Sequence, residues 1–185
     1  PYNRDTDGDG LSDGDEVHVT AAGLDLPSMG VNPLHKDLLI EYDWFDDAIG
    51  GPSHSHKPTQ AELDGVAAVF ANAPVSNPDG RPGIHVIQDV GQGYPFTGGE
   101  LITNHSPIIQ SLAPGDDYET VLRQHMDINR LTRFHYVLMA HAMAGTDSGG
   151  SAEIVGFRVM TALSVYTAHR RRQEVDAPTG LSQTE

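Results

Sequence analysis

The chain of 185 residues has no cysteine, few basic residues and no long apolar run. Without cysteine, the fold cannot be held by disulfides. Lys and Arg number 11 against 26 Asp and Glu, and the formal net charge of −15 argues against nucleic acid or anionic membranes as partners. Because no run of about 18 apolar residues occurs, we predict no membrane span. The hydrophobic content of 38% is ordinary and predicts one globular domain with a real core.

The most specific motif lies at the N-terminus, where residues 5–16 read DTDGDGLSDGDE. This segment fits the calcium-loop pattern D-x-[DN]-x-[DN]-G-x5-E at every defined position. Gly10 occupies the sixth position, where the backbone must turn sharply. Because calcium prefers oxygen ligands, the spacing predicts a Ca2+ site formed by the carboxylates of Asp5, Asp7, Asp9, Asp13 and Glu16 and the carbonyl of Leu11.

The loop resembles the calcium loops of thrombospondin type 3 repeats, and the resemblance covers residues 5–16. Only four residues precede it, too few for the entering helix of an EF-hand. A dockerin is the weaker alternative, because a dockerin needs two such loops. The resemblance implies an extracellular or cell-surface protein in which calcium, bound at about 0.1–1 mM, is structural. Since the chain begins at Pro1, we expect an export signal upstream in the parent protein.

The remaining sequence predicts an α/β fold, with a calcium loop and connector at residues 1–35 and an α/β domain at residues 36–185. Apolar alternation or runs predict strands over 36–45, 83–89, 134–141 and 156–163, with a continuation of the preceding helix as the alternative at 134–141. Helical spacing predicts helices over 60–72 and 118–131, the first with a capping box. The sequence from Ser164 could open a further helix, but the polar tail at 173–185 lacks an apolar face to close it. Long Gly- and Pro-rich connections are expected over 90–116 and 145–150. The element order suggests a mixed, twisted sheet with flanking helices.

Three phrases, at residues 32–44, 77–86 and 134–141, resemble the N-terminal half of the catalytic domain of secreted zincin-type metallopeptidases. The resemblance covers about residues 32–163 and implies a twisted sheet with helices behind it and calcium loops alongside. A zincin also needs H-E-x-x-H to bind zinc, but this sequence contains no His-Glu pair. Either the zinc helix follows Glu185 in a longer parent, which would then bind Zn2+, or catalysis has been lost. We therefore predict no catalytic residue, and whether the parent is an enzyme stays open.

Histidine is frequent, with ten residues, and two of them form an H-x-H pair at His54 and His56. Asp43, Asp46 and Asp47 are near in sequence, so the pair is either part of a transition-metal site or a pair of solvated loop histidines. His135 and His141 are six residues apart and share a face, as core or hydrogen-bonded histidines would.

Two functions fit these features. The first is part of an exported, calcium-dependent zincin-like metallopeptidase acting on a polypeptide substrate. The second is a non-catalytic, calcium-stabilised module of a surface layer, appendage or fibre, whose partner is a neighbouring subunit. An H-E-x-x-H motif shortly after Glu185 in the parent would favour the first.

Overall fold

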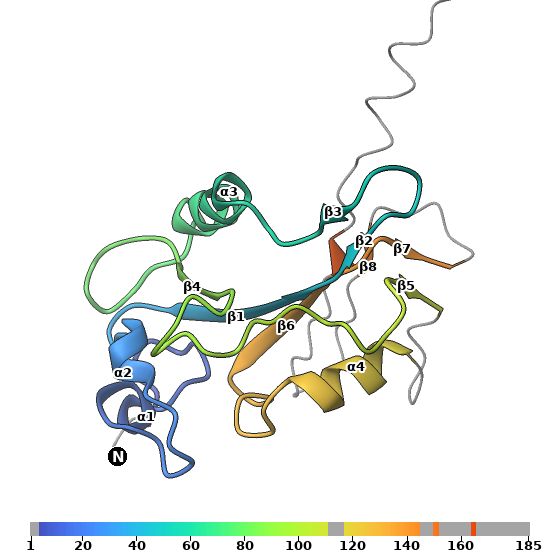
Figure 1. Ribbon diagram of the computed structural model, residues 1–185. Helices are drawn as coiled ribbons and strands as arrows, with labels where there is room; N and C mark the ends of the chain where they lie inside the picture. Colours follow the sequence, from blue (N-terminus) through green and yellow to red (C-terminus); the bar gives the residue numbers. More distant parts are fainter. Residues whose placement is uncertain (1–3, 111–116, 145–149, 152–163, 166–185) are drawn as a thin grey trace, which may run out of the picture.

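The computed structural model describes residues 4–110, 117–144, 150–151 and 164–165. Its centre is a three-stranded parallel sheet in the order β4-β1-β6, formed by β4 (His85–Asp89), β1 (Asp37–Trp44) and β6 (Phe134–Met139). Helix α3 (Gln60–Ala71) lies on one side of this sheet and α4 (Asp117–His125) on the other (Figure 1). The α/β class predicted from the sequence is confirmed.

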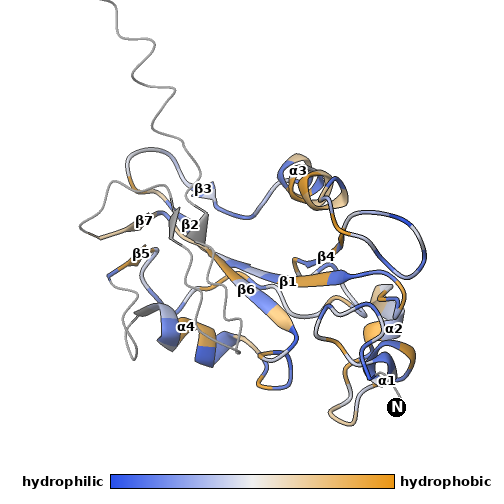
Figure 2. Ribbon diagram, turned by 180° about the vertical axis from the view of Figure 1, so that it is seen from behind, coloured by the Kyte–Doolittle hydropathy of each residue, from blue (hydrophilic) through white to orange (hydrophobic). Residues whose placement is uncertain are grey.

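The central strand β1 is buried on both faces because its side chains alternate between two cores. Ile40, Tyr42 and Trp44 pack with Leu63 of α3 on one side. Leu39 packs on the other side with residues of α4 and of the N-terminal segment. Figure 2 shows that β1 nevertheless carries hydrophilic stretches, and its buried polar side chains include Glu41 and Asp43.

Helix α3 connects β1 to its parallel neighbour β4, as a crossover between parallel strands requires. Its predicted capping box is present: the Thr59 side chain accepts from the Glu62 amide, and the Glu62 side chain accepts from the Thr59 amide. The chain then turns back at Gly83 with φ of 96°. A Cβ there would lie 2.3 Å from the Ala71 carbonyl oxygen, so only glycine fits this return.

The long segment after β4 is not a detached loop but packs along the carboxyl end of β1. The Trp44 amide donates to the Glu100 carbonyl at 3.1 Å, and the Ile102 amide donates to the Trp44 carbonyl at 2.8 Å. Farther along, β5 (Ile108–Ile109) pairs in parallel with β7 (Ala142–Met143). Residues 111–116, the last part of the predicted loop, lie outside the described residues.

Helix α4 ends at His125, six residues before the predicted end. The Asp127 carboxylate accepts from the Asn129 amide at 2.8 Å, and the Arg130 amide donates to the Asp127 carbonyl at 2.8 Å. Such local bonds from an aspartate compete with helical hydrogen bonding. Residues 126–133 therefore form turns that direct Arg130 into the core.

Other short elements were not predicted. The N-terminal segment contains α1 (Asp13–Val17) and α2 (Leu26–Met29), and β2 (Asp46–Asp47) pairs antiparallel with β3 (His54–Ser55). β8 (Gly150–Ser151) pairs antiparallel with β9 (Ser164–Val165), so Ser164 and Val165 lie in a strand and do not open a helix. The predicted strand 156–163 lies outside the described residues. The three described strands of the central sheet are all parallel, whereas a mixed sheet was expected.

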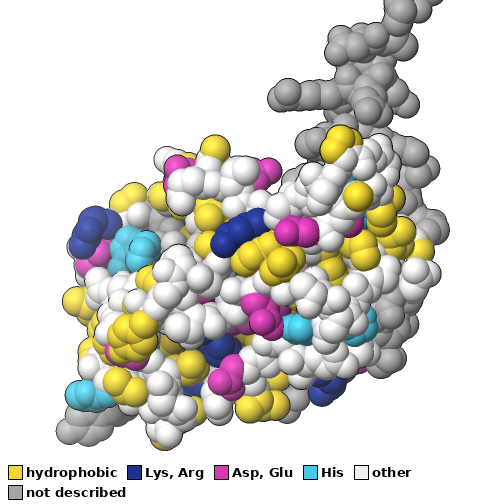
Figure 3. All heavy atoms as spheres, in the orientation of Figure 1, with side chains coloured by type: hydrophobic (Ala, Val, Ile, Leu, Met, Phe, Trp, Pro, Cys, Tyr) yellow, Lys and Arg dark blue, Asp and Glu magenta, His cyan; other side chains and the backbone are white. Residues whose placement is uncertain are grey.

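The surface mixes acidic, basic, histidine and hydrophobic side chains on the face seen in Figure 3. Within the described ranges, no helix combines the length and apolar character that crossing a bilayer requires.

Candidate metal centre

The N-terminal loop packs directly on the sheet. Leu11 is 5% exposed and belongs to the same hydrophobic cluster as Leu26 and Leu39. The Asp37 amide at the start of β1 donates to Asp9 Oδ2 at 2.8 Å. The Arg133 guanidinium, just before β6, donates to Asp15 Oδ2 at 2.7 Å. The loop therefore shares its core and its polar contacts with residues of the α/β sheet.

Two groups of carboxylates overlap at Asp9. One group is Asp5, Asp7 and Asp9, and the other is Asp9, Glu16 and Asp37; within each, one oxygen per residue lies within 4.8 Å of the others. Gly8 and Gly10, with φ of 79° and 98°, allow the backbone to wind around Asp5. The Asp5 carboxylate accepts from both of their amides, at 2.6 and 3.0 Å. This winding points the acidic side chains toward one another.

Glu16 is the decisive residue of this arrangement. It is 2% exposed, and neither of its carboxylate oxygens has a hydrogen-bond partner among the described residues. Asp7 Oδ2 is buried and unpartnered in the same sense. Burying a carboxylate without a partner is costly. A hard cation between these oxygens would remove that cost, so the donor set fits Ca2+.

The electrostatics of the loop agree with this geometry. Burial, the largest cause, and the nearby charges of Asp9, Asp7 and Asp37 together raise the pKa of Glu16 to about 8. Burial also raises the pKa of Asp9 to about 6, against the lowering effect of the Asp37 and Leu11 amides. Desolvation likewise raises the pKa of Asp7. Folding therefore brings together acids that resist ionisation unless a positive charge joins them.

The structure places four of the predicted side-chain ligands in two overlapping groups: Asp5 and Asp7 lie with Asp9 in one, and Glu16 lies with Asp9 in the other. Asp13 differs, because both of its oxygens accept from Thr6, each at 2.7 Å. The roles of Asp13 and of the Leu11 carbonyl as ligands stay predictions. The sequence interpretation missed Asp37, a buried acid 21 positions after Glu16. Its one signal was an acidic residue near the start of the predicted strand.

Comparison of the chain with protein-family models, with curated proteins and with solved structures found no match. The interpretation of each site therefore depends on its own geometry.

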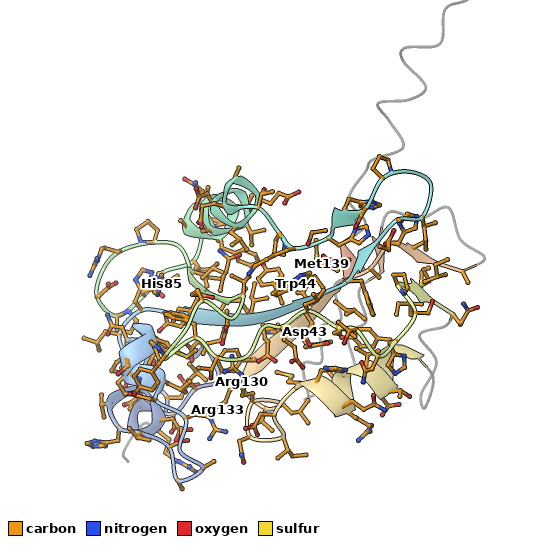
Figure 4. The ribbon with its side chains drawn as sticks, in the orientation of Figure 1. Asp43, Trp44, His85, Arg130, Arg133 and Met139 are labelled. Carbon is orange, nitrogen blue, oxygen red and sulfur yellow. The ribbon has the colours of Figure 1, made fainter. Side chains whose placement is uncertain are left out.

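A second polar cluster lies under the sheet on the α4 side. Arg130 is 4% exposed and is held between two buried carboxylates, with its Nε paired to Glu41 and one terminal nitrogen 2.6 Å from Asp89 Oδ2. Its guanidinium also lies 3.8 Å from the centre of the Phe134 ring. Figure 4 shows Arg130 and Asp43 on the opposite side of β1 from Trp44 and Met139. Because the positive charge of Arg130 is paired with the buried carboxylates of Glu41 and Asp89, we assign the cluster a structural role.

Gly98 lies directly against this cluster. Its amide donates to Asp89 Oδ2 at 2.9 Å, and a Cβ there would lie 2.3 Å from Glu41 Oε2.

The cluster predicts a pH dependence of stability. Burial raises the pKa of Glu41 to about 7 from 4.5, and the neighbouring Asp43 and Asp89 add to the shift while Arg130 opposes it. Between about pH 4.5 and 7 the folded chain holds a proton that the unfolded chain releases, so this group's contribution to stability falls as pH rises. Glu41→Gln mimics the protonated form, and we expect it to remove that slope, worth about 3 kcal/mol in all. Urea unfolding of both proteins from pH 4 to 8 measures the difference; parallel curves would contradict the assignment.

A third cluster joins β1, α4 and the segment after β4. Tyr136 donates its hydroxyl to Asp43 Oδ2 at 2.6 Å, and the Glu100 amide donates to Asp43 Oδ1 at 2.8 Å. The His125 ring contacts Glu100 Oε1 at 2.6 Å and Asn104 Oδ1 at 3.1 Å. Since these polar groups already satisfy one another, the cluster needs no ligand.

The structure also places the histidines singled out in the sequence. His54 and His56 lie with Asp47 and His141 in one group. His135 stands on β6 outside that group, and burial lowers its pKa. His135 and His141 do not share a strand, contrary to the expectation that they lie on one face, because β6 ends at Met139, before His141.

Proposed function

We propose that this chain is a calcium-binding module of an extracellular or cell-surface protein. The observation that carries the proposal is Glu16, a buried carboxylate that has Asp9 and Asp37 beside it and, among the described residues, no hydrogen-bond partner on either oxygen. Asp5, Asp7, Asp9 and Glu16 would hold the ion, with the Leu11 carbonyl as a further ligand. The ion supplies positive charge that offsets the repulsion among these acids.

The ion would act as a staple between the loop and the sheet. Asp9 belongs to the loop and Asp37 to β1, and the Asp37 amide already donates to Asp9. Fixing Asp9 and Glu16 around an ion therefore also fixes the beginning of the central strand. In a chain without cysteine, such a metal staple replaces the stabilising effect that disulfides give to exported proteins.

Placement outside the cell follows from the affinity expected of such loops. Extracellular calcium modules bind at about 0.1–1 mM, so they are filled only where calcium is abundant. A structural rather than a signalling role fits this range, because the loop is built into the core through Leu11.

The parent protein is proposed to be an exported zincin-like peptidase. Support comes from the resemblance alone, and its three phrases include β1, the start of β4 and β6, which are neighbours in the sheet. The alternative is a non-catalytic module of a surface layer, appendage or fibre, favoured by the lack of any His-Glu pair in this sequence. The parent sequence after Glu185 separates the two: an H-E-x-x-H motif supports the peptidase, and its absence supports the structural module.

Amide hydrogen exchange tests the calcium proposal residue by residue. With millimolar calcium, we expect slower exchange at the loop amides of Gly8, Gly10 and Leu11 and at Asp37, since closing the ion site suppresses local opening. The α3 amides, far from the ion, serve as the internal control. Magnesium at the same concentration should give less protection, because it demands a smaller, octahedral site. Equal exchange with calcium and with chelator would contradict the proposal.

A further inference from the structure

Four metal-binding side chains meet where β1 leaves the sheet. Asp47 and His54 are paired across the β2–β3 hairpin, so their side chains share one face, and His56 follows two residues later on that face. His141 comes from a distant part of the chain, between β6 and β7. Its amide donates to the Pro107 carbonyl at 2.9 Å, and the His56 amide donates to the Phe45 carbonyl at 2.9 Å. Backbone contacts thus position both histidines.

The three imidazoles converge on one carboxylate. His56 Nε2 lies 2.7 Å from Asp47 Oδ2, His141 Nδ1 lies 3.3 Å from the same oxygen, and His54 Nε2 lies 3.7 Å from Asp47 Oδ1. Ring centroids are 4.8 to 5.8 Å apart, and one ligand atom per residue lies within 4.8 Å of the others. Donor atoms around a tetrahedral zinc ion are about 3.3 Å apart, given zinc–ligand distances near 2.0–2.1 Å. The observed spacings bracket that value.

The hydrogen bonds of the described residues leave one buried nitrogen of this cluster without a partner. His141 Nδ1 is buried and makes no hydrogen bond within the described part of the chain. His54 Nδ1 lies 3.0 Å from the Pro52 carbonyl oxygen, which can accept only if Nδ1 carries the proton. Its Nε2 then has a lone pair on the side of Asp47. A backbone carbonyl behind a histidine ring is the usual support of a metal ligand, because it fixes the tautomer.

We infer that Asp47, His54, His56 and His141 form a binding site for Zn2+. Three imidazole nitrogens and one carboxylate oxygen are ligands that zinc prefers, and four protein ligands close a tetrahedral site. Calcium should bind this site poorly, since it takes oxygen ligands almost exclusively. The set contains no helical H-E-x-x-H pair, so it is a structural centre that fastens the β2–β3 hairpin to the β6–β7 connection.

This site is independent of the calcium loop. Asp37 begins β1 and Asp47 lies just beyond its end, so the eight-residue strand separates the two sites by about 25 Å. Figure 1 shows β2, β3 and β7 gathered at the end of the sheet away from α1. Failure of either proposal therefore leaves the other standing.

Zinc titration of the full chain, without a polyhistidine tag, tests the inference. We expect one equivalent of zinc, a rise in melting temperature on binding, and, with Co2+ in its place, the intense visible bands of a four-coordinate ion. His56→Gln and His141→Gln should each weaken zinc binding at least tenfold. His18→Gln, a change at an exposed histidine on the N-terminal segment, is the matched control and should bind as the unchanged protein does.

Melting each variant in EDTA shows whether it still folds. Glu16→Gln, a change at the other proposed site, should still bind one equivalent of zinc while losing calcium. Substoichiometric zinc at micromolar free metal would overturn the inference. So would equal loss of binding in the His18 control, or octahedral cobalt spectra.

Discussion

Glu16→Gln is expected to melt lower than the unchanged protein in calcium, but not in chelator. With about 10 mM calcium and a dissociation constant of about 0.1–1 mM, binding stabilises the fold by about 1.5–3 kcal/mol. For a domain of this size that corresponds to roughly 3–10 °C. The glutamine removes one charge and leaves a single carbonyl acceptor where Glu16 should supply two oxygens, so most of that gain should vanish.

In chelator, Glu16→Gln should melt no lower than the unchanged protein at neutral pH, and above it as the pH rises. Burial raises the pKa of Glu16 to about 8, so without the ion this carboxyl is mostly protonated at neutral pH, and a neutral amide of equal size costs little. As pH rises from 4.5 through 8, the Glu16 carboxyl loses its proton in the unfolded chain before it does so in the folded chain, so the ion-free protein loses stability. The glutamine variant has no such proton and lacks this loss. Asp64→Asn, which removes a charge on the exposed face of α3, should melt like the unchanged protein in both buffers. A deficit of equal size with calcium and with chelator would argue against an ion at Glu16.

Arg130→Met is expected to be the most damaging substitution in the described chain. It leaves Glu41 and Asp89 buried without their cation, and removing one member of a buried ion cluster costs about 3–5 kcal/mol. Contact with the Phe134 ring is lost as well. The stability of Arg130→Lys should lie between that of the unchanged protein and that of Arg130→Met, because a single ammonium cannot pair with both carboxylates in the geometry of the guanidinium fork.

Arg133→Met provides the matched comparison three residues away. Arg133 pairs with Asp15, and both side chains are about a quarter exposed, so its loss should cost less than about 1 kcal/mol. Urea unfolding in saturating calcium gives both values. Combining Arg130→Met with Glu41→Gln should recover part of the stability, since one buried charge then has no need of a partner. Equal costs for the two arginines would contradict the burial argument.

Sequence alone predicted the elements whose signals are local. The alternation around Ile40 and the capping box at Thr59 lie within single elements, and both β1 and α3 appear where predicted. The acidic loop at residues 5–16 could be singled out because its acids are set by spacing within 12 residues. Helix α4 was predicted too long because the turn at Asp127 depends on Arg130 being drawn into the core.

The missed residues depend on contacts between distant segments. Asp37 reaches Asp9 only when the loop packs on the sheet, and His141 reaches Asp47 only when β6 lies beside β1. No spacing rule predicts these pairs. The H-x-H pair gave a partial signal, but its remaining partners come from the opposite strand of its hairpin and from the far end of β6.

The most direct test of the central claim is the anomalous scattering of crystals grown in millimolar calcium. The account predicts one peak among the carboxylates of Asp5, Asp7, Asp9 and Glu16, with an oxygen of Glu16 in direct contact with the ion. A well-ordered loop with no ion there, and with Glu16 paired to protein groups instead, would contradict it.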